Sequence, residues 1–120
     1  MKNRSKLLGD WGEKVAQEHL KNDGYEILTS NWRCSIGELD VVAKDGETIV
    51  ACEVKTRTSA KFGTPLEAIG KDKARRLKQL LYAYLLANSM KAKSVRIDIV
   101  GVTGIPDSDP TIDHLKGIEF

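Results

Sequence analysis

The segment from Gly37 to Arg57, GELDVVAKDGETIVACEVKTR, carries charged residues among its valines. They include Glu38, Asp40, Glu53 and Lys55. Charges within a strand cost free energy unless they are solvated, paired or bound to a cation. Two carboxylates with a nearby lysine can hold a divalent cation and handle a proton or a phosphate. The segment therefore predicts either a metal-dependent hydrolytic site or a solvated strand face with ordinary ion pairs.

The turn of this segment decides which charged residues meet. Asp45-Gly46, between two apolar stretches, is one of the strongest hairpin signals that a sequence can contain. A two-residue turn there predicts Asp40 opposite Ala51, and the same register places Glu38 opposite Glu53. Asp40 and Glu53 are then diagonal neighbours, with Cβ atoms about 7–8 Å apart or less. At that separation, both carboxylates can reach one hard cation such as magnesium.

The alternation of side chains along a strand places the four charged residues on one face of the hairpin. Lys55 follows Glu53 by two residues and would lie beside a bound cation. A lysine there can orient or deprotonate a water molecule, or neutralise a phosphate. The opposite face is uniformly apolar or small, and consists of Leu39, Val41, Ala43, Val50, Cys52 and Val54.

The elements that position the hairpin follow from apolar periodicity. Leu7, Leu8, Trp11, Val15, Ala16 and Leu20 form the apolar stripe of a helix over residues 5–22. A second amphipathic helix over 72–90 has Leu77, Leu80, Leu81, Tyr84 and Leu85 as its stripe. We expect strands over 25–32, 38–44, 48–55, 94–102 and 114–120, the last of them at an edge, with loops over 56–65 and 103–113 and a helical turn over 65–69.

This order predicts an α/β fold in a single domain spanning residues 1–120. The first three strands form an antiparallel meander, and the strand after the second helix is far enough away to return parallel to one of them. The result is a mixed sheet flanked by helices. Because helices would cover both faces at least in part, the charges of the hairpin need a reason.

Composition leaves several function classes open and excludes others. The net charge of +2 neither favours nor excludes nucleic acid. Two cysteines, Cys34 and Cys52, form no disulfide framework, and the first apolar run stops at Leu8, so we expect a cytoplasmic protein without a membrane span. His19 and His114 match no zinc-ligand spacing and are expected to be structural or exposed. No phosphate-binding loop, dinucleotide fingerprint or nucleophile elbow is present.

Asp40 followed by Glu53-Val54-Lys55 resembles the D…(D/E)XK signature of the PD-(D/E)XK nuclease superfamily. Nearly the whole chain resembles the YraN-like family, small and mostly uncharacterised bacterial proteins of that superfamily. The segments that carry this resemblance are GDWGEKVAQEHL, GYEILTSNWR, GELDVVA, CEVKTR, GTPLEAIGKDKARRL, VRIDIVGV and HLKGIEF.

The resemblance implies a restriction-endonuclease-like core, similar to that of archaeal Holliday-junction resolvases. It implies that Asp40 and Glu53 bind Mg²⁺ or Mn²⁺ and that Lys55 is the catalytic lysine. The backbone carbonyl of Val54 would add a ligand. Glu13 on the first helix would join the site, either directly or through a metal-bound water molecule. Glu38 would support the site rather than bind metal.

A nuclease also needs basic residues that contact phosphate. The candidates are Arg57, Lys61, Lys73 and Arg76, which could equally form an ordinary solvated face. The expected activity is metal-dependent endonucleolytic hydrolysis of DNA, with branched DNA in repair or recombination as one substrate class. Two symmetric cuts would require two active centres and hence a homodimer. The alternatives are a catalytically weak or inactive nucleic-acid-binding module with a nuclease fold, and a structural interaction domain with a solvated sheet face.

Overall fold

The computed structural model describes residues 4–59, 61 and 69–118, and the structural statements below concern these residues. In chain order the elements are α1 (Arg4–Asn22), β1 (Glu26–Cys34), β2 (Gly37–Asp45), β3 (Thr48–Arg57), α2 (Lys71–Ala87), β4 (Ser94–Thr103) and β5 (Thr111–Leu115). Neither of these helices has the length and apolar character needed to cross a membrane.

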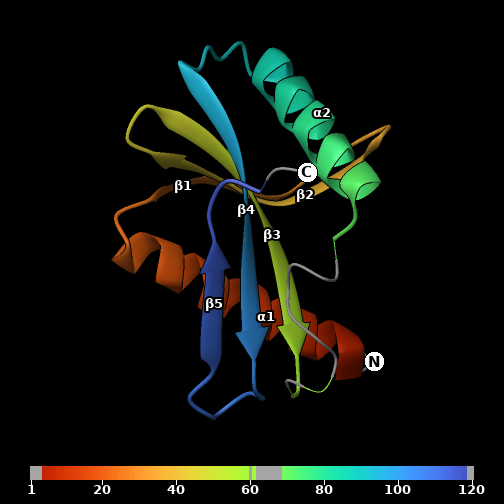
Figure 1. Ribbon diagram of the computed structural model, residues 1–120, viewed down its shortest axis with the longest axis vertical. Coiled ribbons are helices and arrows are strands. Elements are labelled where there is room, and N and C mark those ends of the chain that lie inside the picture. Colours follow the sequence, from red (N-terminus) through yellow and green to blue (C-terminus); the bar gives the residue numbers. More distant parts are fainter. Residues whose placement is uncertain (1–3, 60, 62–68, 119–120) are drawn as a thin grey trace.

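The five strands form one mixed sheet in the order β1-β2-β3-β4-β5. Neighbouring strands are antiparallel except for β3 and β4, which are parallel because α2 carries the chain back between them. The sheet twists strongly, so β1 and β2 run across the direction of β3, β4 and β5 (Figure 1). The predicted α/β class, with a meander followed by a parallel strand, is confirmed.

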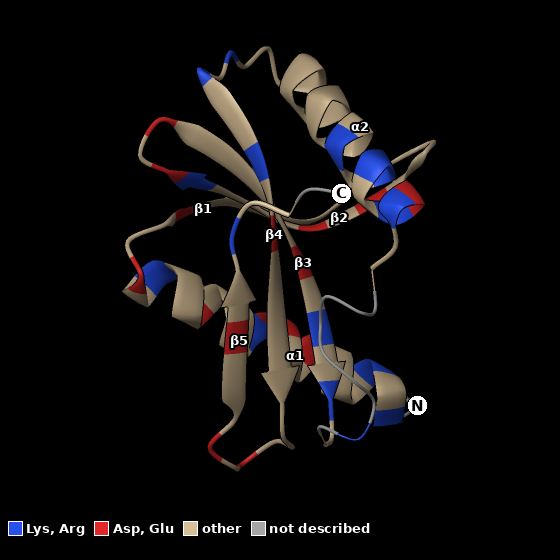
Figure 2. Ribbon diagram, in the orientation of Figure 1, with Lys and Arg blue, Asp and Glu red and all other residues tan. Residues whose placement is uncertain are grey.

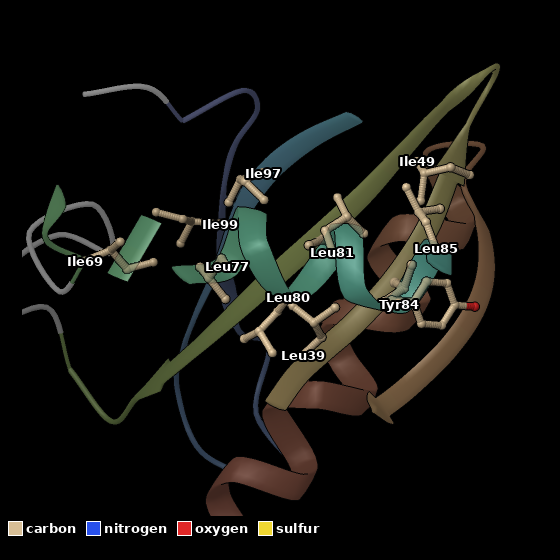
Figure 3. Close-up of a cluster of buried hydrophobic side chains, with 12 residues drawn as sticks. Leu39, Ile49, Ile69, Leu77, Leu80, Leu81, Tyr84, Leu85, Ile97 and Ile99 are labelled. Carbon is tan, nitrogen blue, oxygen red and sulfur yellow. The ribbon is translucent and has the colours of Figure 1, made fainter. Parts of the chain in front are cut away.

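Each face of the sheet is covered by one helix. The α2 face buries all five residues of the predicted stripe, Leu77, Leu80, Leu81, Tyr84 and Leu85. They pack on residues of β2, β3 and β4 that include Leu39, Ile49 and Ile99 (Figure 3). Burial of such a stripe is what holds an amphipathic helix on a sheet.

The opposite face packs against α1. Ala16 and Leu20 are fully buried there against Val100 and Val102 of β4. Leu7, which the periodicity places in the same stripe, is instead 51% exposed, because the packing of α1 on the sheet begins at Trp11. Within α1, a Cβ atom at Gly12 would overlap the side chain of Thr56, so the helix backbone approaches β3 very closely.

The register of the central hairpin differs from the predicted one by two residues. Asp45 faces Thr48 and Val42 faces Ala51, so Gly46 and Glu47 form the turn. Gly46 has φ 60°, a conformation that glycine adopts at little cost, and this places the turn one position later than the Asp-Gly signal indicated. A shift of two residues leaves the side chains of the paired residues 41–45 and 48–52 on their predicted faces.

Two loop boundaries also differ from the prediction. Thr56 and Arg57 belong to β3, where they pair with β4. The last strand begins at Thr111, because its residue Ile112 pairs with Val102 and packs against the α1 cluster. It ends at Leu115, since the chain turns at Gly117 with φ 70°. Of the predicted helical turn over 65–69, residues 65–68 lie outside the described residues, as does the end of the predicted last strand at 119–120.

Candidate functional site

The candidate site lies where β2 separates from β3. The pairing between these strands runs from Asp45–Thr48 to Val41–Cys52. At the next residue, the Oδ2 atom of Asp40 accepts a hydrogen bond from the backbone N–H of Val54 at 2.9 Å. The side chain of Asp40 thus replaces a backbone carbonyl as the partner of β3. The carboxylate of Asp40 is thereby fixed against the backbone between Glu53 and Lys55.

The alternation of side chains along β2 breaks at the same position. Leu39 and Val42 both pack in the α2 cluster, whereas Val41 packs in the α1 cluster. The prediction that Leu39 shares a face with Val41 was therefore wrong. On β1, the residue between the pairs Ser30–Val41 and Trp32–Leu39 is Asn31, which has φ 53°. This irregularity interrupts the two-residue period on both strands.

Glu53 is the buried acid of the site, with 6% of its surface exposed. Its Oε1 atom lies 3.7 Å from Nζ of Lys55 on the same strand and 3.5 Å from Nζ of Lys73 on α2. These two lysines neutralise a carboxylate that would otherwise be costly to bury. In Figure 2, β3 carries an acidic segment followed by basic ones, and the first turns of α2 carry basic residues.

A cavity of about 290 Å³ opens onto Glu53 and Lys73 from the α2 side of the sheet, and Lys55 is not among the described residues that line it. Its charged lining consists of Glu38, Asp40, Glu53, Lys73 and Arg76, and its apolar lining comes from Ile36, Leu77 and Leu80. The structure therefore brings two of the predicted phosphate-contacting residues, Lys73 and Arg76, to the two predicted metal-binding carboxylates. It joins acidic and basic groups in one cavity of a size that fits a phosphodiester group.

The electrostatics of the cavity favour a cation. Burial, and then the negative charge of Glu53, raise the pKa of Asp40 to about 6, against the lowering effect of the hydrogen bond from Val54. At neutral pH Asp40 is thus ionised at an electrostatic cost. A divalent cation between the two carboxylates would lower that cost, and carboxylate oxygens are the donors that Mg²⁺ and Mn²⁺ prefer. The residues present therefore fit a hard metal ion.

Glu13 adjoins this pair from the α1 side rather than joining it. Its Oε2 atom accepts a hydrogen bond from Nδ2 of Asn31 at 3.2 Å, and both residues line a second cavity of about 530 Å³. Burial raises the pKa of Glu13, and the negative charges of Asp40 and Glu38 contribute to this increase. Among the described residues, however, Glu13, Asp40 and Glu53 do not form a group whose ligand atoms all lie within 4.8 Å of one another.

The remaining predicted residues are placed as follows. Glu38 pairs with Nε of Arg33 at 2.8 Å, which suits a supporting position at the cavity rim. The backbone carbonyl of Arg57 accepts a hydrogen bond from the N–H of Gly104 at the end of β3. Lys61 is exposed. Arg57 and Lys61 do not line the cavity of Asp40 and Glu53, as far as the described residues show it. The catalytic roles of all these residues stay predictions.

Sequence reasoning missed a buried polar network around Asp98 on β4, which has no exposed surface. Its carboxylate accepts hydrogen bonds from the hydroxyl of Tyr25, from Nε of Arg96, from Nε2 of His114 and from the N–H of Gly117. Burial alone would raise the pKa of Asp98, but the bonds from His114, Arg96 and Gly117 lower it to about 2. A lone Asp in the apolar strand SVRIDIVGV was the available signal, because a buried charge requires partners.

Comparisons with known proteins give one family. The family described as "Uncharacterised protein family UPF0102" matches residues 12–102. A "UPF0102 protein" of Nocardioides sp. is 40% identical over 111 residues, which cover 92% of this chain and 90% of that protein. Another from Beutenbergia cavernae is 44% identical over 111 residues, which cover 92% of this chain and 94% of the relative.

Among solved structures, that of SfsA from Pyrococcus furiosus in complex with Ca²⁺ aligns with a TM-score of 0.43 at 14% sequence identity. The alignment covers 97% of this chain and 65% of the SfsA chain.

Proposed function

The chain belongs to the uncharacterised protein family UPF0102, and we propose that it is a metal-dependent endonuclease that hydrolyses phosphodiester bonds in DNA. The observation that carries this proposal is the hydrogen bond from Val54 to Asp40. It holds the Asp40 carboxylate beside Glu53 in a cavity that Lys73 and Arg76 also line. Lys55 pairs with Glu53 on the same strand. In the proposal, the fold is a restriction-endonuclease-like core, and Asp40 with Glu53-Val54-Lys55 is its PD-(D/E)XK motif.

Asp40 and Glu53 would hold one or two Mg²⁺ or Mn²⁺ ions, with the backbone carbonyl of Val54 as a further ligand. The raised pKa of Asp40 supports this assignment, because burial and then the negative charge of Glu53 disfavour its ionised form, and a bound cation would favour that form. When bound, such an ion lowers the pKa of a water molecule and stabilises negative charge on a phosphate. Glu13 would act from the α1 side through an intervening water.

Lys55 and Lys73 have distinct parts in this proposal. Lys55 lies on the same strand as Glu53 and is only partly exposed, so it is positioned to orient the attacking water or accept its proton. Lys73 lies on α2, where its half-exposed side chain can move from Glu53 to a phosphate once Glu53 binds a cation. Arg76, one turn further along α2 in the same cavity, would contact the adjacent backbone phosphate.

The substrate class is the finer part of the proposal. Branched DNA in repair or recombination is the substrate that the resemblance to resolvases supports. A homodimer would supply the two active centres that a pair of symmetric cuts requires.

One observation favours a second candidate function, a nucleic-acid-binding module with little or no turnover. Glu53 is already neutralised by Lys55 and Lys73, so the site is satisfied without a metal ion. In such a module the lysines would be structural partners of Glu53, and DNA would bind through the exposed basic residues of α2.

The test is a cleavage panel with labelled four-way junction, flap, single-stranded and duplex DNA, each with Mg²⁺, Mn²⁺ or EDTA. Glu53→Gln removes the buried charge, and Glu47→Gln makes the same change at the exposed tip of the same hairpin. We expect metal-dependent cutting by the wild type and by Glu47→Gln, and none by Glu53→Gln. Equal cutting by both variants would refute the site. DNA binding without cutting by the wild type would favour the binding module.

A further inference from the structure

We propose that His19, Asp23 and His114 form a second cation site, one that takes a transition-metal ion of the zinc type. These residues come from the last turns of α1, the turn that follows it and the edge strand β5. One possible ligand atom from each residue lies within 4.8 Å of those of the other two. Among the described residues, these three therefore form a group that is compact enough to hold one metal ion. The site is independent of the proposed nuclease function.

The two imidazoles already have close to the geometry of metal ligands. Nε2 of His19 and Nδ1 of His114 are 3.0 Å apart. Two nitrogens bound to a tetrahedral zinc ion at about 2.0–2.1 Å lie about 3.3–3.4 Å from each other. The rings need to separate by only a few tenths of an ångström to admit the ion. Imidazole nitrogens favour zinc over magnesium, which prefers oxygen ligands.

Asp98 fixes the orientation of His114. Nε2 of His114 lies 2.8 Å from Oδ2 of Asp98, which can only accept, so Nε2 carries the proton. The lone pair of His114 is therefore on Nδ1, which faces His19. A carboxylate that holds the second nitrogen of a metal-binding histidine is the usual support of such ligands. Asp98 is fully buried and held by further hydrogen bonds from Tyr25 and Arg96, so this support is rigid.

Lys116 is the group that competes with a metal ion. Its ammonium lies 3.1 Å from Oδ2 of Asp23, where it supplies the positive charge that an ion would otherwise bring. The Lys116 side chain is 50% exposed and can move into solvent. Coordination of a metal ion would then replace the His19–His114 hydrogen bond and the Lys116–Asp23 ion pair, and it would join α1 to β5. With three protein ligands, one tetrahedral position would be left for water.

The site is separate from the carboxylates of the candidate active site. His19 follows Glu13 by six residues on α1, which places them about 9 Å apart along the helix axis. Variants can therefore address one site while leaving the other intact. Glu53→Gln removes a carboxylate of the first site, and Asp23→Asn removes one from the second.

The test is a titration of the full chain with zinc sulfate. Calorimetry measures the affinity and stoichiometry, and NMR spectra monitor the imidazole signals. Because the chain has only two histidines, both signals belong to the proposed ligands. In a background of excess Mg²⁺, which would occupy the carboxylates of the first site, we expect one zinc ion per chain to bind with micromolar or tighter affinity and to shift both imidazole signals, whereas Mg²⁺ alone should leave these signals unchanged. His19→Gln and Asp23→Asn should weaken binding about tenfold or more, judged from the effect of losing even an outer-shell group. Lys116→Met should strengthen binding.

Control variants separate this site from the other groups that could bind zinc. Cys34→Ser and Glu53→Gln should leave zinc affinity and the imidazole shifts unchanged, and circular dichroism would establish that each variant is folded. Unchanged affinity in His19→Gln, loss of binding in Cys34→Ser or Glu53→Gln, or no imidazole shift in the wild type would each overturn the proposal. Loss of DNA cleavage with intact zinc binding would bear on the nuclease alone.

Discussion

The carboxylate of Asp40 accepts the backbone N–H of Val54 at the point where β2 and β3 stop pairing. This hydrogen bond brings three charged groups together at the end of the hairpin, because it holds the carboxylate of Asp40 between the adjacent side chains of Glu53 and Lys55. It also explains why charges are tolerated there. Each charged group has either a backbone donor or an oppositely charged neighbour.

Asp40→Asn is expected to abolish DNA cleavage and to change the pH dependence of stability. The pKa of Asp40 is raised from 3.8 to about 6, so ionising it costs more in the folded protein than in the unfolded chain. Stability should fall as pH rises from about 4 to about 6, by about 1–3 kcal/mol in the wild type. Urea unfolding at several pH values would measure this loss, which should be absent in Asp40→Asn. An identical pH profile in both proteins would contradict the assigned cause.

Lys73→Met should separate metal binding from DNA binding. Removing the ammonium that pairs with Glu53 leaves this carboxylate more available, so Mg²⁺ affinity should rise several-fold. DNA binding should weaken at the same time, with a smaller dependence on salt, because one phosphate contact is lost. Calorimetry and a salt titration of DNA affinity would test both effects. Lys78→Met, on the same helix but outside the cavity, is the control and should leave Mg²⁺ affinity unchanged.

Leu80→Ala should destabilise the α2 face by about 2–5 kcal/mol, since Leu80 is 2% exposed in the centre of that cluster. Leu86→Ala makes the same change on the same helix at a residue that is 83% exposed, and it should alter stability by less than about 0.5 kcal/mol. Denaturant unfolding of the two variants would show the difference. Equal effects would mean that α2 is not docked as described.

Gly12→Ala should loosen α1 from β3, because the added methyl group would overlap Thr56. Thr56 follows Lys55 and Gly12 precedes Glu13, so the displacement would also disturb both sides of the candidate site. We expect a loss of about 1–3 kcal/mol in stability. Gly9→Ala is the matched control, since a Cβ there meets nothing within 4 Å, and it should stabilise the helix by up to about 1 kcal/mol. A stabilised Gly12→Ala would contradict the close approach.

Asp98→Asn should cost about 3 kcal/mol, because it leaves Arg96 without its buried carboxylate. The pKa of Asp98 is lowered to about 2 in the folded protein, so its stabilising effect is present above about pH 4. It is lost as pH falls toward 2, which is the reverse of the trend expected for Asp40. Acid unfolding of the wild type and the variant would measure it. Asp109→Asn, in an exposed loop, should unfold like the wild type.

The sequence predicted the elements of this fold well because their signals are local. The stripe of α2 and the Asp-Gly turn each lie within a short segment. Apolar periodicity predicts the first, and the Asp-Gly pair between two apolar stretches predicts the second. The register was wrong by two residues because Asp45-Gly46 and Gly46-Glu47 are both plausible turn positions, and in the structure Gly46, with φ 60°, stands first in the turn rather than second. The face of Leu39 was wrong because alternation ends where a side chain takes the place of a backbone acceptor, which no local pattern shows.

The parts of the site that the sequence could not predict depend on distant residues. Asp98 finds Tyr25 and His114 only after α1, β1 and β5 are assembled around β4. Likewise, the pairing of Lys73 with Glu53 depends on how α2 lies across the sheet, whereas helical periodicity specifies only which residues face inward. Motif spacing indicated that Asp40, Glu53 and Lys55 are neighbours, but it could not show that Glu13 lines a different cavity.

The packing of α1 against the last two strands has a consequence for synthesis of the chain. Ala16 and Leu20 precede all five strands in the chain, yet they are buried against β4, and His19 contacts β5. At about 5–20 residues per second, roughly 5–20 s pass between translation of Leu20 and of His114. During that interval α1 can pack on β2 and β3, whose Val41, Ala43, Val50 and Cys52 belong to the same cluster, but not on β4 and β5. The cluster beneath α1 is therefore completed only after Val100, Val102 and Ile112 of the last two strands have been made.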